Sequence, residues 1–297
     1  MAEFCIGTAQ FGMDYGIANT SGQPRQEEID QIVASAVDNG IRFFDTAQSY
    51  GNSESFLGKA LEKLEHKNSL RFVSKLSPDL HSSSSDIIIK TVKSSVQNLN
   101  IESLYGFLAH QLEAIYTQSF ASAVQQLKNE EIIFKSGVSV YTPDEAKTAL
   151  ENPLVEILQI PLNILDRRWI DEMILKKAEE KNVQLFFRSI FLQGLIFLNA
   201  HDLKKVQMEW AHPYLDQFKT LVSETSLSLV ELSINVLSNL SGDNIIIIGV
   251  DNYQQLQENI NIISNLEPDK TFIQNWWSSI PAFPEKLLNP SLWPITK

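Results

Sequence analysis

The sequence predicts an α/β fold, a single-domain (β/α)8 barrel of the TIM type, because short apolar runs alternate with amphipathic helical patterns along the whole chain. The eight expected strands are residues 4–8, 41–44, 71–74, 104–108, 133–139, 155–160, 183–188 and 244–248. Eight such units fit a chain of 297 residues, since a barrel of this type commonly occupies about 250 residues as one domain. We therefore expect one domain over residues 1–297.

The helical patterns between these strands each have one apolar face. From Ile29 to Val37, apolar side chains recur at spacings of three and four residues, and Gly40 is placed to end this helix before the next strand. The same spacing recurs from Phe56 to Leu64 and from Ile89 to Leu99. A strand and a helix in alternation are what a parallel sheet requires.

Composition narrows the function classes. The net charge of −12, with Lys and Arg dispersed, argues against a nucleic-acid partner. No apolar run approaches the roughly 18 residues of a membrane span, and the start, with Glu3, does not read as a signal peptide. Cys5 is the only cysteine, and no His or Cys pair has metal-ligand spacing, so we expect neither a disulfide nor a metal. A soluble, cytoplasmic protein, monomeric or weakly oligomeric, is the resulting expectation.

Four side chains that can hold or move a proton stand at or just after expected strands. Asp45 and Tyr50 follow the strand at 41–44, Lys75 ends the next one, and His110 follows the one after that. Taken singly, Asp45 is more often a partner for backbone N–H groups and Lys75 a solvated charge. Since active sites of such barrels lie at the carboxyl ends of the strands, their order on successive strands favours a shared site.

Together these residues can protonate an oxygen atom. A tyrosine with a pKa near 10 is a poor acid, and we expect the Lys75 ammonium to lower the pKa of Tyr50 so that its phenol donates a proton. Asp45 supplies the counter-charge that Lys75 needs, and His110 can donate a hydrogen bond to a substrate oxygen. The set is suited to protonating a carbonyl oxygen while another group delivers a hydride.

The motifs DTAQSYGNSE at 45–54 and GTAQFG at 7–12, with Lys75 and His110, resemble the aldo-keto reductases, whose signature is an Asp, Tyr, Lys and His tetrad on a (β/α)8 barrel. The similarity continues in GVSV at 137–140, LQIPLN at 158–163, RSIFLQG at 188–194 and IIIIGVDNYQQLQEN at 245–259. The resemblance implies an NAD(P)H-dependent oxidoreductase that reduces a small aldehyde or ketone. It implies cofactor contacts at Gly7, Thr8, Ala9, Asp45, Ser139, Gln159, Arg188, Gly194, Gly249, Asn252, Gln255 and Asn259.

Two features depart from the family pattern. Gly249 and Gln255 stand where well-studied members keep a Lys and an Arg for the 2′-phosphate of NADP, and Asp251 adds a negative charge nearby. Arg188 replaces an aromatic ring that stacks on the nicotinamide. We therefore expect either NADP(H) or NAD(H) as cofactor, with NADPH bound through backbone N–H groups near Asn252 and NADH within about tenfold of it.

The substrate end gives weaker indications. Under the resemblance, Gln10, Tyr15, Gln48 and Gln111 would line the entrance, and this polar set suits a hydroxylated carbonyl such as a sugar. The segment from Phe191 to Tyr214 lacks a clear strand, and two interpretations stand equal: a loop over the cofactor, or an irregular excursion without a role.

Two other functions remain open from the sequence. A barrel of this family can act as a cofactor-sensing regulatory subunit that binds a protein partner with little turnover, although a sensor could dispense with Tyr50. A barrel lyase would use Lys75 to form a Schiff base with its substrate, and it would not need Tyr50 beside Asp45.

Overall fold

The computed structural model describes residues 2–65, 67–266 and 270–293 and shows a closed barrel of eight parallel strands in sequence order. The strands are β1 (Glu3–Gly7), β2 (Phe43–Asp45), β3 (Arg71–Lys75), β4 (Leu104–Ala109), β5 (Ile133–Ser139), β6 (Ile157–Ile160), β7 (Gln184–Phe187) and β8 (Asn244–Gly249). Pairing of β8 with β1 closes the barrel. The predicted fold class and strand order are confirmed. The domain bounds 1–297 stay a prediction, since residues 1, 66, 267–269 and 294–297 lie outside the described part.

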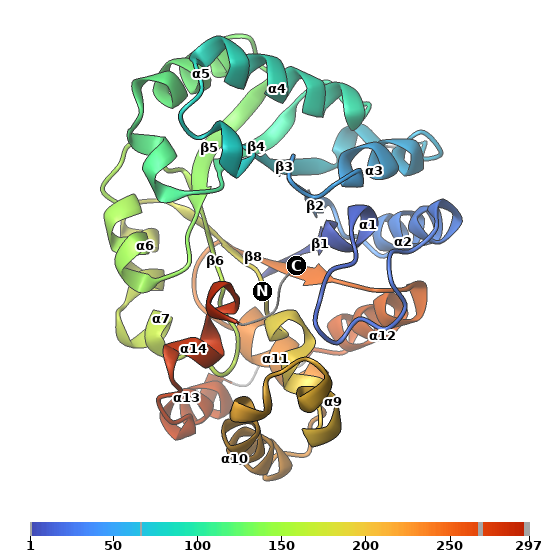
Figure 1. The fold of residues 1–297 in the computed structure, drawn as a ribbon, viewed down its shortest axis with the longest axis vertical. Helices are drawn as coiled ribbons and strands as arrows, with labels where there is room; N and C mark the ends of the chain where they lie inside the picture. Colours follow the sequence, from blue (N-terminus) through green and yellow to red (C-terminus); the bar gives the residue numbers. More distant parts are fainter. Residues whose placement is uncertain (1, 66, 267–269, 294–297) are drawn as a thin grey trace.

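Helices surround the strands as an outer layer (Figure 1). They are α1 (Ala9–Gly12), α2 (Gln26–Asp38), α3 (Ser53–Leu61), α4 (Ser85–Asn98), α5 (Gln118–Asn129), α6 (Pro143–Ala149), α7 (Arg168–Asp171), α8 (Ile174–Glu180), α9 (Ala200–Lys205), α10 (His212–Ser223), α11 (Leu229–Ser238), α12 (Tyr253–Ser264), α13 (Lys270–Ser279) and α14 (Glu285–Leu288). None of the described helices is both long and apolar enough to cross a membrane.

The apolar spacing in the sequence matches the buried faces of the helices. In α2, Ile29, Ile32, Val33 and Ala36 are all buried against the sheet. The helix ends at Asp38, and Gly40 follows with a φ of +85°, a left-handed conformation that glycine adopts without a steric penalty. The predicted helix and its end are therefore confirmed.

Two apolar layers hold the barrel together, one inside it and one between strands and helices. The inner layer consists of Cys5, Phe43, Val73, Leu108, Ile157, Phe186, Ile245 and Ile247. Above it, the strand register sets Gly7 beside both Asp45 and Gly249, and Ser139 beside Gln159. Polar groups thus replace apolar ones at the carboxyl ends of the strands, where the barrel opens.

The segment from Phe191 to Tyr214 forms short helices and packs on the loop that follows α1. The Ile17 N–H donates to the Gln193 carbonyl at 3.0 Å. Gly194 has a φ of +87°, and a Cβ there would lie 2.5 Å from the Ala18 Cβ. Glycine is therefore required at 194 both by backbone conformation and by the close approach of the two loops.

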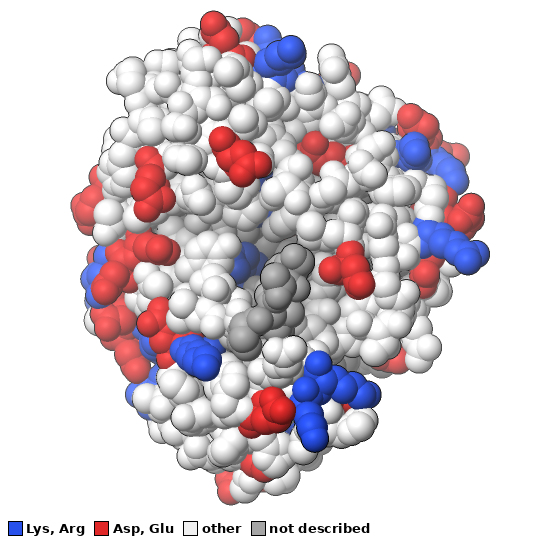
Figure 2. All heavy atoms as spheres, viewed as in Figure 1, with Lys and Arg blue, Asp and Glu red and all other residues white. Residues whose placement is uncertain are grey.

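Charged side chains on the face seen in Figure 2 are mixed. Lys and Arg occur in small separate groups, and Asp and Glu lie between them. Many of the basic groups are paired with acids on neighbouring elements, as Lys63 is with Asp30 and Lys147 with Glu172.

The contact between α3 and the end of α4 gives a test of the packing. A Cβ on Gly58 would lie 2.1 Å from the Asn98 carbonyl oxygen. In a helix interior, alanine normally stabilises a protein by about 1 kcal/mol relative to glycine. Here the steric overlap of the new Cβ with the Asn98 carbonyl should outweigh that gain. We expect Gly58→Ala to lower the free energy of unfolding by about 1–3 kcal/mol, measured by denaturant titration. Ser94→Ala, on the exposed side of α4, should leave it unchanged or slightly raised; a stabilising Gly58→Ala would contradict this packing.

Candidate active site

Lys75 is the centre of the candidate site. Its side chain is fully buried, and Nζ lies 2.8 and 2.7 Å from the two carboxylate oxygens of Asp45. Nζ also donates to the Thr46 carbonyl at 2.8 Å and to the Tyr50 hydroxyl at 3.4 Å. A buried ammonium requires this full set of acceptors, because an unpaired charge in a dry interior is strongly destabilising.

Asp45 is held from the opposite side by β6. The Gln159 side-chain amide donates to Asp45 Oδ1 at 2.8 Å. Asp45 is 4% exposed and Gln159 is fully buried. The carboxylate therefore joins the ends of β2, β3 and β6.

The backbone around Tyr50 touches the loop after β1. A Cβ on Gly12 would lie 1.8 Å from the Tyr50 carbonyl oxygen, and one on Gly51 would lie 2.3 Å from the Gly12 carbonyl oxygen. Ser53 Oγ adds a hydrogen bond of 2.7 Å to the Thr8 carbonyl. The motifs at 7–12 and 45–54 therefore form one unit, and the fixed backbone sets the direction of the Tyr50 ring.

The acidity of Tyr50 differs from the sequence-based expectation. Burial, and after it the negative charge of Asp45, raise the pKa of Tyr50 above its ordinary value of 10, with Arg188 opposing them. The expected net lowering of this pKa is therefore not found, because burial and Asp45 outweigh the effect of nearby positive charge. The phenol therefore keeps its proton throughout the neutral range.

His110 stands beside Tyr50 on the rim. The two rings meet edge to face with centroids 6.2 Å apart. Burial, followed by the positive charges of Lys75 and Arg188, lowers the pKa of His110 to about 3. At neutral pH the imidazole is therefore uncharged, with one nitrogen donating and the other accepting.

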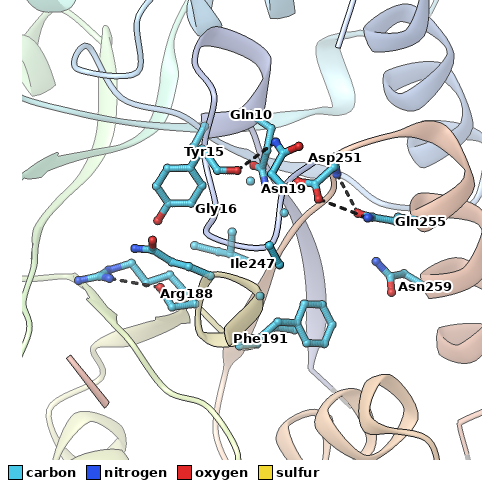
Figure 3. A pocket seen from close by; sticks show the side chains of 18 of the residues that line it. Gln10, Tyr15, Gly16, Asn19, Arg188, Phe191, Ile247, Asp251, Gln255 and Asn259 are labelled. Atoms are coloured by element: carbon cyan, nitrogen blue, oxygen red, sulfur yellow. Dashed lines mark hydrogen bonds between the residues drawn. The ribbon is translucent and has the colours of Figure 1, made fainter. Parts of the chain in front are cut away.

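A cavity of about 410 Å³ opens above Tyr50 and Asp45 (Figure 3). Its walls include the expected cofactor residues Gly7, Thr8, Ala9, Asp45, Arg188, Gly194, Gly249, Gln255 and Asn259. Ser139 lines a neighbouring pocket of about 460 Å³ together with His110. Gln159 is buried beneath the rim, and the Asn252 side chain caps α12 by accepting from the Gln255 N–H at 2.9 Å. The cavity runs from the tetrad to the start of α12.

Arg188 is fixed at the tetrad end of this cavity. Its Nε donates to Ser139 Oγ at 3.2 Å, and Nη2 donates to the Val140 carbonyl at 3.1 Å. The guanidinium also lies 4.5 Å from the centroid of the Tyr141 ring. Tyr141 could not be identified from the sequence, because no motif marks it; only the fold brings its ring beneath Arg188.

The expected entrance residues divide into three groups. Gln10 and Tyr15 line the large cavity, whereas Gln111 lines the pocket beside His110. Gln48 is bound into the framework instead: it accepts from the Ser77 N–H at 3.1 Å and donates to Ser95 Oγ at 3.2 Å. Both polar ends of Gln48 are therefore engaged in holding the turn after β3.

The segment from Phe191 to Tyr214 contributes to the cavity wall through Phe191, Gln193, Gly194 and Phe197. Of its two interpretations, a loop over the site agrees with this position. Among the described residues, no group of three or more His, Cys, Asp or Glu side chains could hold a metal ion.

Comparisons with known proteins agree with this geometry. The family model described as "Aldo/keto reductase family" matches residues 3–279. The aldo-keto reductase YhdN of Bacillus subtilis (strain 168) is 20% identical over 292 residues, covering 88% of each chain. Protein REDOX 2 of Catharanthus roseus is 24% identical over 194 residues, which span 58% of this chain and 59% of that protein.

A solved structure shows the same fold. The holo form of the aldo-keto reductase AKR11C1 from Bacillus halodurans superposes with a TM-score of 0.73 at 20% identity, covering 94% of this chain and 92% of that one. With the family model matched over nearly the whole chain and the barrel in common, this protein is a member of the aldo-keto reductase family, and by that membership an oxidoreductase of carbonyl compounds.

Proposed function

We propose that the protein reduces an aldehyde or ketone to an alcohol with NADH or NADPH, and that Tyr50 donates the proton. The contact that supports this most directly is that of Lys75 Nζ with both the Asp45 carboxylate and the Tyr50 hydroxyl. This arrangement sets a protonated phenol, with a buried cation behind it, in the wall of a cavity of about 410 Å³.

The residues beneath the cavity fit a nicotinamide. Gln159 donates its amide to Asp45, which leaves Oε1 buried without a hydrogen-bond partner among the described residues. Ser139 Oγ accepts from Arg188 and still has a proton to donate. Gln159 would accept from a carboxamide NH2 and Ser139 would donate to its carbonyl. A reduced nicotinamide held there would supply the hydride for the substrate carbon.

Proton transfer from Tyr50 depends on how the tetrad stabilises the negative charge left on the phenol oxygen. As the Tyr50 hydroxyl gives its proton to the carbonyl oxygen, negative charge develops on the phenol oxygen, 3.4 Å from Lys75 Nζ. The ammonium, which is itself fully buried, stabilises this charge. Asp45 forms an ion pair with Lys75 and raises the pKa of Tyr50. Lys75 therefore acts mainly on the developing phenolate.

His110 orients the carbonyl as a neutral donor. Ser49 Oγ lies 3.4 Å from Nδ1, and if the hydroxyl donates to this nitrogen, the ring proton stands on Nε2. Nε2–H can then donate to the same carbonyl oxygen that Tyr50 protonates. Because an uncharged imidazole does not compete as an acid, the proton comes from Tyr50.

The pocket beside His110 is the candidate substrate subsite. Its lining includes Gln111, Tyr141, Glu113 and Glu145, together with His81. Amide, hydroxyl and carboxylate groups pair with substrate hydroxyls, so we propose a hydroxylated carbonyl compound rather than a large apolar one.

The geometry weighs against a Schiff-base lyase. An amine nucleophile needs a free lone pair, whereas the buried Lys75 ammonium is surrounded by four acceptor oxygens. A cofactor-sensing regulatory subunit is also less favoured, because no proton donor would be needed beside a buried ion pair.

The state of His110 gives the first test of this mechanism. With a pKa near 3, the imidazole should remain neutral from pH 8 down to about pH 4, and ¹⁵N chemical shifts should show the proton on Nε2. A His110→Ala variant identifies the resonance. Titration of His110 near its ordinary pKa of about 6.5 would mean that the ring is solvated and not held as proposed.

The second test removes the proton donor. Tyr50→Phe deletes the hydroxyl and keeps the ring, so turnover with small aldehydes should fall by about 10²–10⁴, while cofactor affinity stays nearly unchanged. Steady-state oxidation of NADH or NADPH measures turnover, and fluorescence titration measures cofactor affinity. Tyr116→Phe, a variant at an exposed tyrosine that lines neither pocket, is the matched control. Near-normal turnover of Tyr50→Phe would refute the proposed donor.

The third test concerns coupling between Lys75 and Tyr50. Lys75→Met should be at least as damaging as Tyr50→Phe, and should move the alkaline limb of the pH–rate profile upward, because Asp45 is left uncompensated beside the phenol. Since both residues act on one proton, the double variant should be no slower than about the worse single variant. A double variant slower by the product of both factors would show that the two act independently.

A further inference from the structure

The far end of the cavity, opposite the tetrad, is acidic. Asp251 and Glu258 line it from the start of α12, and Arg188 is the only Lys or Arg among the described lining residues. Figure 3 shows Arg188 across the cavity from Asp251, and its guanidinium is bound to Ser139 and Val140. A ligand group at the Asp251 end therefore meets carboxylates without a neighbouring cation from the lining.

Asp251 is held in place by two amides. Gln255 donates to Oδ2 at 3.3 Å and accepts from the Asp251 N–H at 2.9 Å. Gln10 donates to Oδ1 at 3.5 Å. A Cβ on Gly249 would lie 2.8 Å from Gln10 Nε2, so a longer side chain at 249 would displace the Gln10 amide. Gly249 and Gln255, which stand where relatives carry cations, instead support a carboxylate.

The start of α12 offers few free donors to an anion. A helix N-terminus normally attracts negative charge through its unpaired N–H groups. Here the Tyr253 N–H donates to Glu28 Oε1 at 3.1 Å, and the Gln255 N–H donates to Asn252 Oδ1 at 2.9 Å. A carboxylate from α2 thus already takes the place of an external anion. These are the groups that the sequence analysis expected to bind a phosphate.

Asn259 points to a neutral polar ligand at this end. It lines the cavity and is 6% exposed. Figure 3 shows it directed from α12 toward the cavity. An amide both donates and accepts hydrogen bonds, so it pairs equally well with a hydroxyl or a heterocyclic nitrogen.

We propose that Asp251, supported by Gln10 and Gln255, selects NADH over NADPH. This inference rests on the proposed function. A carboxylate accepts a hydrogen bond from a ribose 2′-hydroxyl, whereas a 2′-phosphate with close to two negative charges would face Asp251, Glu258 and the filled helix N-terminus. We expect NADPH to bind at least tenfold more weakly than NADH. This replaces the expectation from sequence, in which NADPH binds and NADH lies within about tenfold of it.

The test is calorimetric titration of the purified protein with NADH and with NADPH at fixed low ionic strength. Asp251→Asn removes the charge with little change in size. This variant should bind NADH more weakly and NADPH more tightly, and the ratio of NADH affinity to NADPH affinity should fall at least fivefold. Glu28→Gln should bind NADPH more tightly and leave NADH affinity unchanged. Asp144→Asn is the matched control: it changes net charge equally at a side chain that is 92% exposed, and it should leave the ratio unaltered.

The outcomes separate the two levels of the proposal. If both cofactors bind and NADPH binds as tightly as NADH or more tightly, the selectivity is refuted while carbonyl reduction stands. An unchanged ratio in Asp251→Asn refutes Asp251 as its source. Absence of binding by either cofactor would refute the proposed function itself and the selectivity with it.

Discussion

The structure of the site depends on the buried ion pair between Lys75 and Asp45. Neither charge can be accommodated alone at these buried strand ends, because the cost of an unpaired ion there exceeds any single hydrogen bond. The pair therefore fixes the ends of β2 and β3 relative to each other. Gln159 binds the carboxylate from β6 and the Tyr50 hydroxyl meets the ammonium, so the position of the phenol is tied to the same pair.

Close backbone packing gives this pair its surroundings. Gly12 and Gly51 let the loops after β1 and β2 come into contact with no room for a side chain, and Ser53 joins them through Thr8. Lys75 is fully buried beside the phenol, so its charge acts on the phenol oxygen at low dielectric. Burial also raises the pKa of Tyr50 in the resting protein. Burial thus opposes ionisation of the phenol, and the Lys75 ammonium offsets part of this cost when the proton is transferred.

The barrel and the meeting of Asp45, Tyr50, Lys75 and His110 could be predicted because both follow from order along the chain. Strands of a parallel barrel all end at one rim, so residues at successive strand ends must converge. Other features depend on partners distant in sequence. That burial and Asp45 raise the pKa of Tyr50, or that Gln48 turns toward Ser95 rather than the entrance, follows from three-dimensional packing. Spacing alone contains no sign of either.

The two ends of the cavity differ in whether their carboxylates are paired with a positive charge. At the tetrad, Asp45 is compensated by Lys75, and Arg188 adds a cation within the wall. At the start of α12, Asp251 is bound only by neutral amides, which orient a carboxylate without cancelling its charge. In a chain of net charge −12, the wider field adds to this difference rather than opposing it. An anionic cofactor is therefore best accommodated when its charge lies toward the tetrad side and the end facing α12 is neutral.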